Sequence, residues 1–373
     1  MESRVVVVHA DFDPVKGIDR PGSHQIYKNP RVSVEKRKLP ALRPNEIRVK
    51  MIYAGICGTD VHLVTKNPDN GYIRCSAPAQ INASGRVIGH EGIGKVLEVG
   101  SQVYHVQPDA YVTFESIIVC HYCDECRRGD FNQCRHALLL GLEKDGLFGD
   151  IVDIPSIVTH DVSDLVKSEK GRRAATCVEP AGVAYVACQN TRLGAGDIVV
   201  IFGAGPIGLF AAMLSKVVFG ASQVHVVEPV PFRRKLAEKW SDQIYDVKEF
   251  FNHGPSRIDV AIEASGEMGN INNVFRKLNA NGRVALLGRS GETLSLDAID
   301  HMITNEIYII GSRGHLGGAF SNILTLYRNK RIALEEAVTG VINGPEELCN
   351  LLISPEKLIE ENCKVLVNFD NNK

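Results

Sequence analysis

The sequence predicts an α/β fold in two parts: a β-rich part with the glycine bends of a small barrel, and a doubly wound parallel sheet. Two observations predict it. Strand-forming segments fill much of the chain up to Phe114. From Ile198 onward, short apolar strands alternate with helix-length segments. Such alternation is typical of a parallel sheet that helices cover on both faces.

Length and composition agree with this architecture. The 373 residues are enough for about two domains, and 44% hydrophobic with 23% charged residues is usual for a globular chain. A formal net charge of −2 gives no electrostatic reason to expect nucleic acid or an anionic membrane as a partner. No apolar run approaches the roughly 20 residues that span a bilayer. With no export signal recognised, we expect a cytoplasmic location.

The first part is expected to be built from strands. Val5–Val8 is predicted to be the first, and Ile47–Tyr53 alternates apolar and polar residues as a half-buried strand does. Val87–Gly100 resumes strand character with glycine bends, and Tyr111–Phe114 is predicted to be another strand. Between them, Lys66–Arg86 is polar and rich in turn residues. We therefore predict a loop there, ordered or partly mobile, rather than a core element.

Four cysteines are concentrated within fifteen residues, in the spacing C-x2-C-x2-C-x7-C: Cys120, Cys123, Cys126 and Cys134. Thiolates that converge within one loop suit a tetrahedral zinc ion with four sulfur ligands. The spacing of iron–sulfur proteins, C-x2-C-x2-C-x3-C-P, is not met. Because cysteine fills all four positions, the predicted zinc is structural and holds a lobe at residues 115–137.

A glycine-rich turn organises the second part of the chain. The predicted strand Ile198–Phe202 ends in Gly203, Gly205 and Gly208, and a helix-compatible segment follows. This is the G-x-G-x-x-G order in its strand–turn–helix context, which indicates a dinucleotide-binding fold. Gly203 permits the tight turn, Gly205 lets the backbone approach a pyrophosphate, and Gly208 lets the helix pack close to the strand.

The residues around this turn indicate which dinucleotide is bound. The helix N-terminus, which begins with Pro206 and Ile207, would bind the pyrophosphate. The next strand, Gln223–Glu228, ends in a carboxylate twenty residues after the last glycine, where an acidic residue binds the adenosine ribose hydroxyls. The Glu228 carboxylate would repel a 2′-phosphate, so the sequence favours NAD over NADP. Arg233 is a further candidate for cofactor contact.

The remaining elements follow the same patterns. A helical pattern covers Arg172–Thr191. Further strands of the parallel sheet are predicted at Ile258–Ala264, Val284–Gly288 and Tyr308–Gly311, with helices at Pro231–Trp240 and Gly269–Leu278. The tail is predicted to form helices at Ala319–Asn329 and Pro345–Leu352 and a last strand at Lys364–Asn368.

Several residues that can bind metal or transfer protons stand out against apolar or glycine-rich surroundings: Cys57, Asp60, His62, His90, Glu91 and Glu179. A catalytic zinc keeps three protein ligands and one open position, and a cysteine with a histidine and a third group fits that pattern. Taken singly, a buried, hydrogen-bonded histidine or a core cysteine explains His90 and Cys57 as well. The residues alone leave both interpretations open.

Five motifs stand in the order found in the zinc-dependent medium-chain dehydrogenases/reductases of the alcohol dehydrogenase superfamily: Gly55–His62, Gly89–Gly94, the four-cysteine lobe, Val178–Pro180 and Gly203–Gly208. The chain resembles this family over nearly its whole length. The Glu-Pro pair at 179–180 is most similar to the polyol, threonine and glucose dehydrogenase branches. The resemblance implies a GroES-like catalytic domain at 1–188, a Rossmann NAD-binding domain at 189–318, and a segment at 319–373 that returns to the catalytic domain.

The resemblance also implies a role for each candidate residue. Cys57 and His90 correspond to ligands of the catalytic zinc, with Glu91 or Glu179 as the third protein ligand. Asp60 resembles the carboxylate that orients the ligand histidine. Thr59 and His62 resemble the start and end of a proton relay. Two zinc ions per chain, one catalytic and one structural, and a homodimer or homotetramer are the family expectation.

The implied activity is hydride transfer between NAD and a secondary alcohol of a polyol, sugar, cyclitol or amino alcohol. One alternative is a dehydrogenase for an anionic hydroxy substrate, phosphorylated or carboxylated; another is a non-catalytic nucleotide-binding relative. The candidates for contacting a small polar or anionic substrate are Arg74, Asn82, Arg86, Arg313 and His315. Exposed loop arginines are more often simply solvated, which is the competing interpretation of this group.

Overall fold

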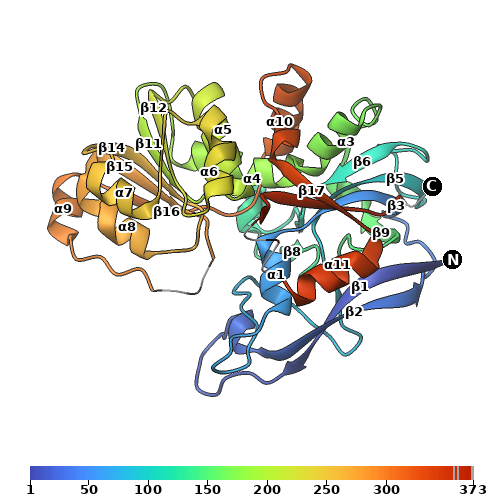
Figure 1. Ribbon diagram of the computed structural model, residues 1–373. Coiled ribbons are helices and arrows are strands. Elements are labelled where there is room, and N and C mark those ends of the chain that lie inside the picture. Colours follow the sequence, from blue (N-terminus) through green and yellow to red (C-terminus); the bar gives the residue numbers. More distant parts are fainter. Residues whose placement is uncertain (290, 292, 356–357, 359–360, 371–373) are drawn as a thin grey trace. The chain divides into compact units, whose positions relative to one another are not determined.

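The computed structural model describes residues 1–289, 291, 293–355, 358 and 361–370. The chain divides into two compact units, whose elements Figure 1 labels. The first unit takes in residues 1–179 and the described residues of 338–359 and 364–373. The second takes in residues 180–337 and the described residues of 360–363. The chain thus leaves the first unit after Glu179 and returns to it at Val338.

These limits differ from the boundaries expected at residues 188 and 318. The helices α4 (Val178–Asn190) and α10 (Ala319–Arg328) both contribute to the second unit. Asn322 Nδ2 on α10 donates a hydrogen bond to the Tyr185 hydroxyl on α4 over 3.2 Å. This hydrogen bond joins two helices that are far apart in the sequence, a pairing that no local pattern marks.

The first unit contains a mixed sheet in the order β10-β6-β5-β3-β18-β17, with β9 also paired to β3. Its pairs are antiparallel except β17–β18, which is parallel. The strands are β3 (Glu46–Gly55), β5 (Glu91–Val99), β6 (Tyr111–Phe114), β9 (Ile151–Pro155), β10 (Thr159–Asp161), β17 (Val338–Asn343) and β18 (Lys364–Asn368). In this register Gly55 of β3 lies opposite Glu91 on one side and Leu366 on the other.

A smaller sheet in the order β2-β1-β4 lies in the same unit. It consists of β1 (Glu2–Phe12), β2 (Tyr27–Lys38) and β4 (Arg86–Val87), all antiparallel. The short helix α1 (Gly58–Val64) follows β3, α3 (Glu169–Thr176) follows β10, and α11 (Gly344–Ile353) follows β17. The predicted first strand, the strand at 47–53 and the last strand are therefore confirmed.

The predicted helical stretch at 172–191 forms two helices. α3 begins three residues earlier than expected because Ser168 caps it: the Ser168 hydroxyl accepts a hydrogen bond from the Gly171 N–H over 3.0 Å. α3 ends at Thr176, and α4 begins again at Val178. Glu179 therefore stands in the first turn of a new helix.

The stretch 66–86 contains no helix, and its only strand residue is Arg86 at the start of β4, within the fully described range 1–289. The prediction of a loop is confirmed, but its exclusion from the core is wrong. Alternate residues are buried in the main core of the first unit: Ile73, Cys75, Ala77, Ala79 and Ile81. Turn residues and charges dominate the composition of this stretch and conceal the alternation of an extended segment with one buried face.

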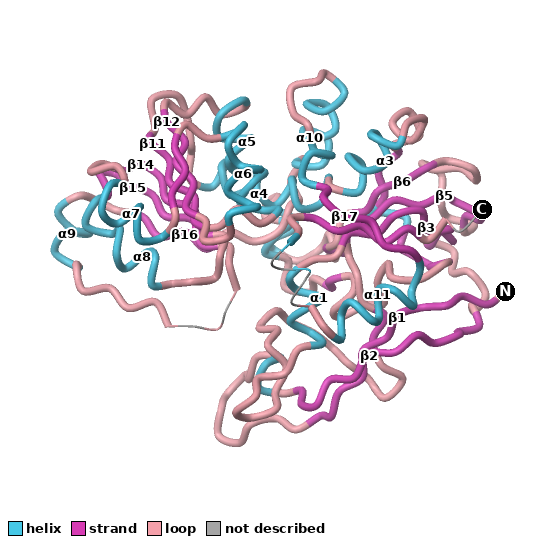
Figure 2. Tube along the Cα trace, viewed as in Figure 1, coloured by secondary structure: helices cyan, strands magenta, loops and turns pink. Residues whose placement is uncertain are grey.

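The second unit contains a parallel sheet in the order β13-β12-β11-β14-β15-β16, whose strands and flanking helices Figure 2 distinguishes by colour. This is the doubly wound order of dinucleotide-binding folds. The strands are β11 (Ile198–Phe202), β12 (Gln223–Val227), β13 (Gln243–Tyr245), β14 (Ile258–Glu263), β15 (Leu278–Leu286) and β16 (Tyr308–Gly311). β13 is not predicted, because its three residues are too few to show a period.

The helices of this sheet are α5 (Pro206–Val217), α6 (Pro231–Ala237), α7 (Val247–His253), α8 (Gly269–Val274) and α9 (Ile299–Thr304). α5 is apolar around most of its surface, since the eight consecutive residues from Gly208 to Ser215 are buried. The predicted helix 231–240 is α6 followed by a 3-10 turn at Glu238–Trp240. In the part of the chain described, no helix is both long enough and apolar enough to cross a membrane.

Candidate metal and cofactor sites

The first candidate site begins where β3 ends. Cys57 precedes helix α1, and its backbone N–H donates a hydrogen bond to Asp60 Oδ2 over 2.9 Å. Asp60 is fully buried in the first turn of α1. Thr59 and His62 are spaced i and i+3 on the same helix, so their side chains lie on one face. The helix thus places the cysteine, the carboxylate and the relay candidates within one short segment.

The second segment of this site is the turn from β4 into β5. Gly89 has a φ of +92°, which favours glycine, and its N–H donates to Asp60 Oδ1 over 3.2 Å. His90 follows, with its Nδ1 3.7 Å from the same Asp60 oxygen. Asp60 therefore binds the backbone beside both Cys57 and His90 and faces the His90 ring. The orienting role expected of it stays a prediction.

Cys57, His90 and Glu91 form a group whose sulfur, nitrogen and oxygen atoms all lie within 4.8 Å of one another. His90 and Glu91 are buried, and Cys57 is half-buried. Burial disfavours the charged form of His90, but Cys57 and Asp60 raise its pKa well above the ordinary value. A sulfur, a nitrogen and an oxygen that converge in this way fit the donor set of a catalytic zinc site.

The sequence pattern missed one member of this site, Lys364. Its ammonium donates to Glu91 Oε2 over 2.6 Å and to the Ile56 carbonyl over 3.0 Å, and both side chains of the ion pair are 1% exposed. Burial alone lowers the pKa of Lys364, but Glu91, Cys57 and Cys177 raise it above the ordinary value, so the lysine stays charged. The pairing spans 273 residues of sequence, and no local motif marks it.

Glu179 is buried beside this group without belonging to it. Its Oε1 accepts a hydrogen bond from the Ser116 hydroxyl over 2.8 Å, and the residue is 5% exposed. Burial raises the pKa of Glu179 to about 7; Glu91 adds to the rise and His90 opposes it. Glu179 is therefore within electrostatic range of both residues. Of the two predicted glutamates, Glu91 is the one whose carboxylate oxygen lies within 4.8 Å of the Cys57 sulfur and a His90 ring nitrogen.

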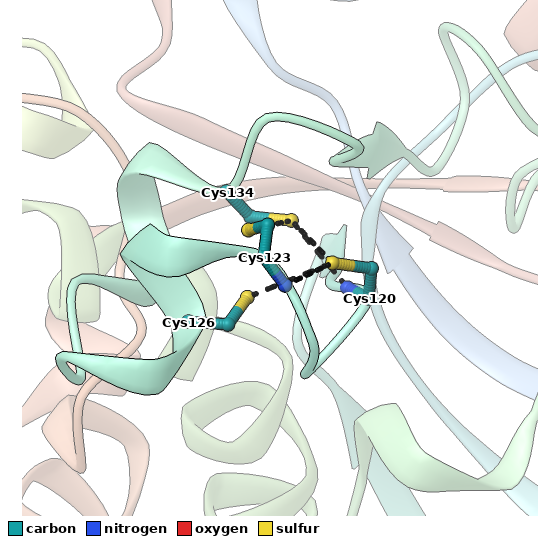
Figure 3. Close-up of side chains that lie close together, drawn as sticks. All are labelled: Cys120, Cys123, Cys126 and Cys134. Carbon is teal, nitrogen blue, oxygen red and sulfur yellow. Dashed lines mark hydrogen bonds between the residues drawn. The ribbon is translucent and has the colours of Figure 1, made fainter.

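The four predicted cysteines converge in a lobe between β7 (Ile117–Ile118) and β8 (Leu138–Leu139), around the short helix α2 (Asp124–Arg127) (Figure 3). Sulfur–sulfur distances are 3.6 Å for Cys120–Cys134, 3.9 Å for Cys123–Cys134 and 4.0 Å for Cys120–Cys126. A tetrahedron with zinc–sulfur bonds of about 2.3 Å has edges of about 3.8 Å. The four sulfurs therefore already have the spacing of a zinc–thiolate site.

The surroundings favour the thiolate form at some cysteines of this lobe more than at others. The N–H of Cys123 donates to Cys120 Sγ, and the N–H of Cys120 donates to Cys134 Sγ, each over 3.4 Å. Burial raises the pKa of Cys120, but N–H donors from Tyr122 and Cys123 outweigh it and lower this pKa to about 6. Burial and neighbouring thiols raise the pKa of Cys126 to about 12. A bound cation would supply the charge that lets all four ionise together.

The glycine turn of the second unit gives each glycine a distinct role. Gly203 has a φ of +91°, which only glycine adopts readily. A Cβ on Gly208 would collide with the carbonyl oxygen of Gly203. At Gly205, by contrast, the nearest atom to such a Cβ is Arg233 Nη1 at 3.9 Å. The turn is therefore tight at its two ends and open at Gly205, where a pyrophosphate needs room.

Glu228, directly after β12, is buried beside this turn. Its Oε2 accepts a hydrogen bond from the Ala204 N–H over 2.6 Å, and its Oε1 accepts one from the Val230 N–H over 2.9 Å. Arg233 Nε donates to the Asn362 carbonyl over 3.0 Å. Each carboxylate oxygen can accept two hydrogen bonds, so Glu228 keeps acceptors for hydroxyl groups. The residues present fit a dinucleotide.

The predicted substrate residues fare differently. Arg86 is 7% exposed, and it donates to Asp145 Oδ1 over 2.8 Å and to the Gln80 carbonyl over 2.9 Å. Its role is therefore to hold the fold.

The other candidates do not share this role. Asn82 is exposed and accepts hydrogen bonds from Ser84 within its own turn. Arg74 is exposed, and after burial it is the second cause that lowers the pKa of His62. In the second unit, Arg313 is half-buried and His315 is fully buried against Phe320.

Comparisons with known proteins agree with this arrangement. The family described as "Alcohol dehydrogenase GroES-like domain" matches residues 43–164, and that described as "Zinc-binding dehydrogenase" matches residues 206–329. L-threonine 3-dehydrogenase of Pyrococcus abyssi is 30% identical over 317 residues, which cover 82% of this chain and 86% of that protein. Sorbitol dehydrogenase of Halalkalibacterium halodurans is 27% identical over 316 residues, which cover 82% and 88%.

Solved structures show the same fold. The crystal structure of 2R,3R-butanediol dehydrogenase from Bacillus subtilis superimposes with a TM-score of 0.77 at 24% identity, over 98% of this chain and 99% of that one. With the converging Cys57, His90 and Glu91, the four-sulfur lobe and the glycine turn, these matches settle the assignment. The chain belongs to the zinc-dependent medium-chain dehydrogenases/reductases, close to the polyol and threonine branches, and is an oxidoreductase that uses zinc and a nicotinamide cofactor.

Proposed function

We propose that this enzyme transfers a hydride between NAD and a secondary alcohol of a polyol, sugar, cyclitol or amino alcohol. The observation that carries the proposal is the converging Cys57–His90–Glu91 group, in which His90 and Glu91 are buried and which Asp60 holds at both of its backbone segments. Threonine and sorbitol, for which the two relatives above are named, both carry secondary hydroxyls. The polar lining around Glu91 and Glu179 favours such substrates over small apolar alcohols.

In this proposal Cys57 and His90 hold the catalytic zinc, with Glu91 or Glu179 as the third protein ligand; Glu91 is the one whose carboxylate lies within 4.8 Å of both other donors. Cys120, Cys123, Cys126 and Cys134 hold a second, structural zinc. When bound, the catalytic ion supplies Lewis-acid polarisation of the alcohol oxygen and the nicotinamide supplies the hydride acceptor. The protein provides the ligands, keeps water out by burial and removes the hydroxyl proton.

Thr59 and His62 are the residues proposed to move that proton. Because they stand on one face of α1, a proton released near Cys57 can pass through the Thr59 hydroxyl toward His62. Burial and the nearby Arg74 lower the pKa of His62. His62 therefore remains neutral near neutral pH, which is the form able to accept a proton.

We assign NAD rather than NADP on the position of Glu228. Its buried carboxylate stands beside the glycine turn with acceptor capacity for ribose hydroxyls, and its charge opposes a 2′-phosphate. Glu228→Gln removes that charge with little change of shape. The ratio of kcat/KM for NAD to that for NADP should fall by at least about tenfold. Glu238→Gln, an exposed glutamate on the following 3-10 turn, is the matched control.

The test of the proposed activity is a screen of secondary alcohols, sugars, cyclitols and amino alcohols, followed by NADH absorbance with the zinc-loaded enzyme. Turnover of at least one polyol or amino alcohol is expected. No response from any of them would contradict the substrate class. Phosphorylated and carboxylated hydroxy compounds belong in the same screen because Arg74 is an exposed cation close enough to act on His62. The homodimer or homotetramer and the cytoplasmic location stay predictions.

A further inference from the structure

The buried ion pair between Lys364 and Glu91 has no role in the proposed chemistry. Both side chains are 1% exposed, and Lys364 Nζ lies 2.6 Å from Glu91 Oε2. The other oxygen, Glu91 Oε1, is buried and has no hydrogen-bond partner among the described residues. Leaving a buried carboxylate oxygen unpaired costs about 1–3 kcal/mol. A buried oxygen without a partner indicates that Glu91 Oε1 binds a group that does not belong to the protein chain.

The sheet register explains how the lysine reaches the site. Gly55 of β3 lies between Leu366 of β18 and Glu91 of β5. A side chain at Gly55 would occupy the place of Glu91 Oε2. The absence of a side chain at Gly55 therefore leaves room for the Glu91 carboxylate, with which Lys364 at the start of β18 pairs.

Lys364 also holds the other ligand-bearing segment. The same ammonium donates to the carbonyl of Ile56, directly before Cys57, and the N–H of Ile56 donates to the Val365 carbonyl over 3.0 Å. Residues of β18 therefore fix Ile56, directly before Cys57, and Glu91, directly after His90. Asp60 fixes the same two segments from the side of α1.

We propose that Lys364 is a positioning residue that weakens Glu91 as a metal ligand. It holds Oε2 and neutralises the carboxylate, while Oε1 has no hydrogen-bond partner among the described residues. Glu91 would therefore give up its place to an alcohol more readily than Cys57 or His90 would. A carboxylate that shares its charge with an ammonium donates less to a cation than a free one does. The inference rests on the proposed function, because it requires a metal at this site.

Lys364→Met tests this directly, since it removes the charge and keeps an apolar side chain of similar length. Without its counter-charge Glu91 should bind the metal more tightly. Release of the catalytic zinc to a chelator should slow about tenfold, a rise of about 1.4 kcal/mol in the barrier to release, and the visible absorption of the cobalt-substituted enzyme should change. The spectrum of Cys57→Ser, subtracted from each, isolates this site from the four-cysteine site. Lys364→Arg keeps the charge and should restore both wild-type readouts.

A second pair of variants keeps the test decisive if Lys364→Met folds poorly. Because the lysine acts through Glu91, Lys364→Met should change neither zinc release nor the cobalt spectrum in a Glu91→Gln background. Unchanged release in Lys364→Met alone, faster release, or an effect that persists in the Glu91→Gln background would each overturn the proposal. None of these readouts needs a substrate, so failure of the substrate screen remains a separate result.

Discussion

Asp60 Oδ1 accepts a hydrogen bond from the N–H of Gly89, the residue before His90, over 3.2 Å. Its second oxygen accepts from the N–H of Cys57 over 2.9 Å. A single buried carboxylate therefore fixes the relative position of the two segments that carry Cys57 and His90. Losing such an outer partner typically lowers metal affinity or activity about 10- to 100-fold.

Replacing Asp60 with asparagine should loosen this arrangement. An amide has one oxygen, so its NH2 group would face one of the two backbone N–H donors that the carboxylate now satisfies. We expect zinc affinity at the Cys57 site or kcat/KM to fall about 10- to 100-fold, measured by chelator competition and steady-state kinetics. Asp69→Asn, at an exposed position in the 66–86 loop, is the control. Wild-type values for both quantities in Asp60→Asn would contradict the role given to this carboxylate.

The glycine turn provides a pair of substitutions with opposite expectations. Alanine at Gly208 would collide with the Gly203 carbonyl and should destabilise the protein by about 1–3 kcal/mol, seen as a lower Tm. Alanine at Gly205 has space, with the nearest atom at 3.9 Å, so Tm should hold while the Kd for NADH rises. Equal Tm values for the two variants would argue against this division of roles.

Cys134→Ser should remove the zinc of the four-sulfur lobe. The zinc content should fall by one ion per chain, and Tm should fall by about 5 °C or more, since loss of a structural metal is among the strongly destabilising changes. Cys349→Ser is the matched control because Cys349 is buried elsewhere and donates to the Val32 carbonyl. Retention of the full zinc content in Cys134→Ser would show that the lobe is held without metal.

The pH dependence of turnover tests the relay. Burial and the charge of Arg74 both lower the pKa of His62, so Arg74→Ala should raise that pKa. Because neutral His62 is the proton acceptor, the acid-side fall of kcat/KM should move to higher pH. Arg74→Lys keeps the charge and should leave the profile in place. A profile that stays fixed, or moves to lower pH, in Arg74→Ala would count against His62 as acceptor.

Local signals account for what the sequence predicts well. The turn Gly203–Gly208 and the run Cys120–Cys134 are each encoded within fifteen residues or fewer, and the structure shows the tight turn and the convergence of the four sulfurs. Cys57, Asp60 and His90 could be singled out because polar residues in apolar surroundings need a partner. Strands of the parallel sheet were predictable because they are buried on both faces and read as continuous apolar runs.

Long-range pairing accounts for what the sequence does not reveal. Lys364 reaches Glu91 only through the register of β18, β3 and β5, which no local pattern specifies. The sequence suggests that Arg86 is a solvated loop arginine, but its side chain is buried and pairs with Asp145. The 66–86 loop contributes Ile73 and Ile81 to the core because its extended backbone buries one face despite a composition typical of turns.

The central claim is that Cys57 and His90 hold a catalytic zinc that is distinct from the zinc of the four-cysteine lobe. Zinc content per chain, determined by elemental analysis of the wild-type protein and of Cys57→Ser alongside their turnover, tests it most directly. We predict two zinc ions in the wild type, and one in Cys57→Ser together with loss of NAD-dependent oxidation. Full zinc content and wild-type turnover in Cys57→Ser would contradict the account.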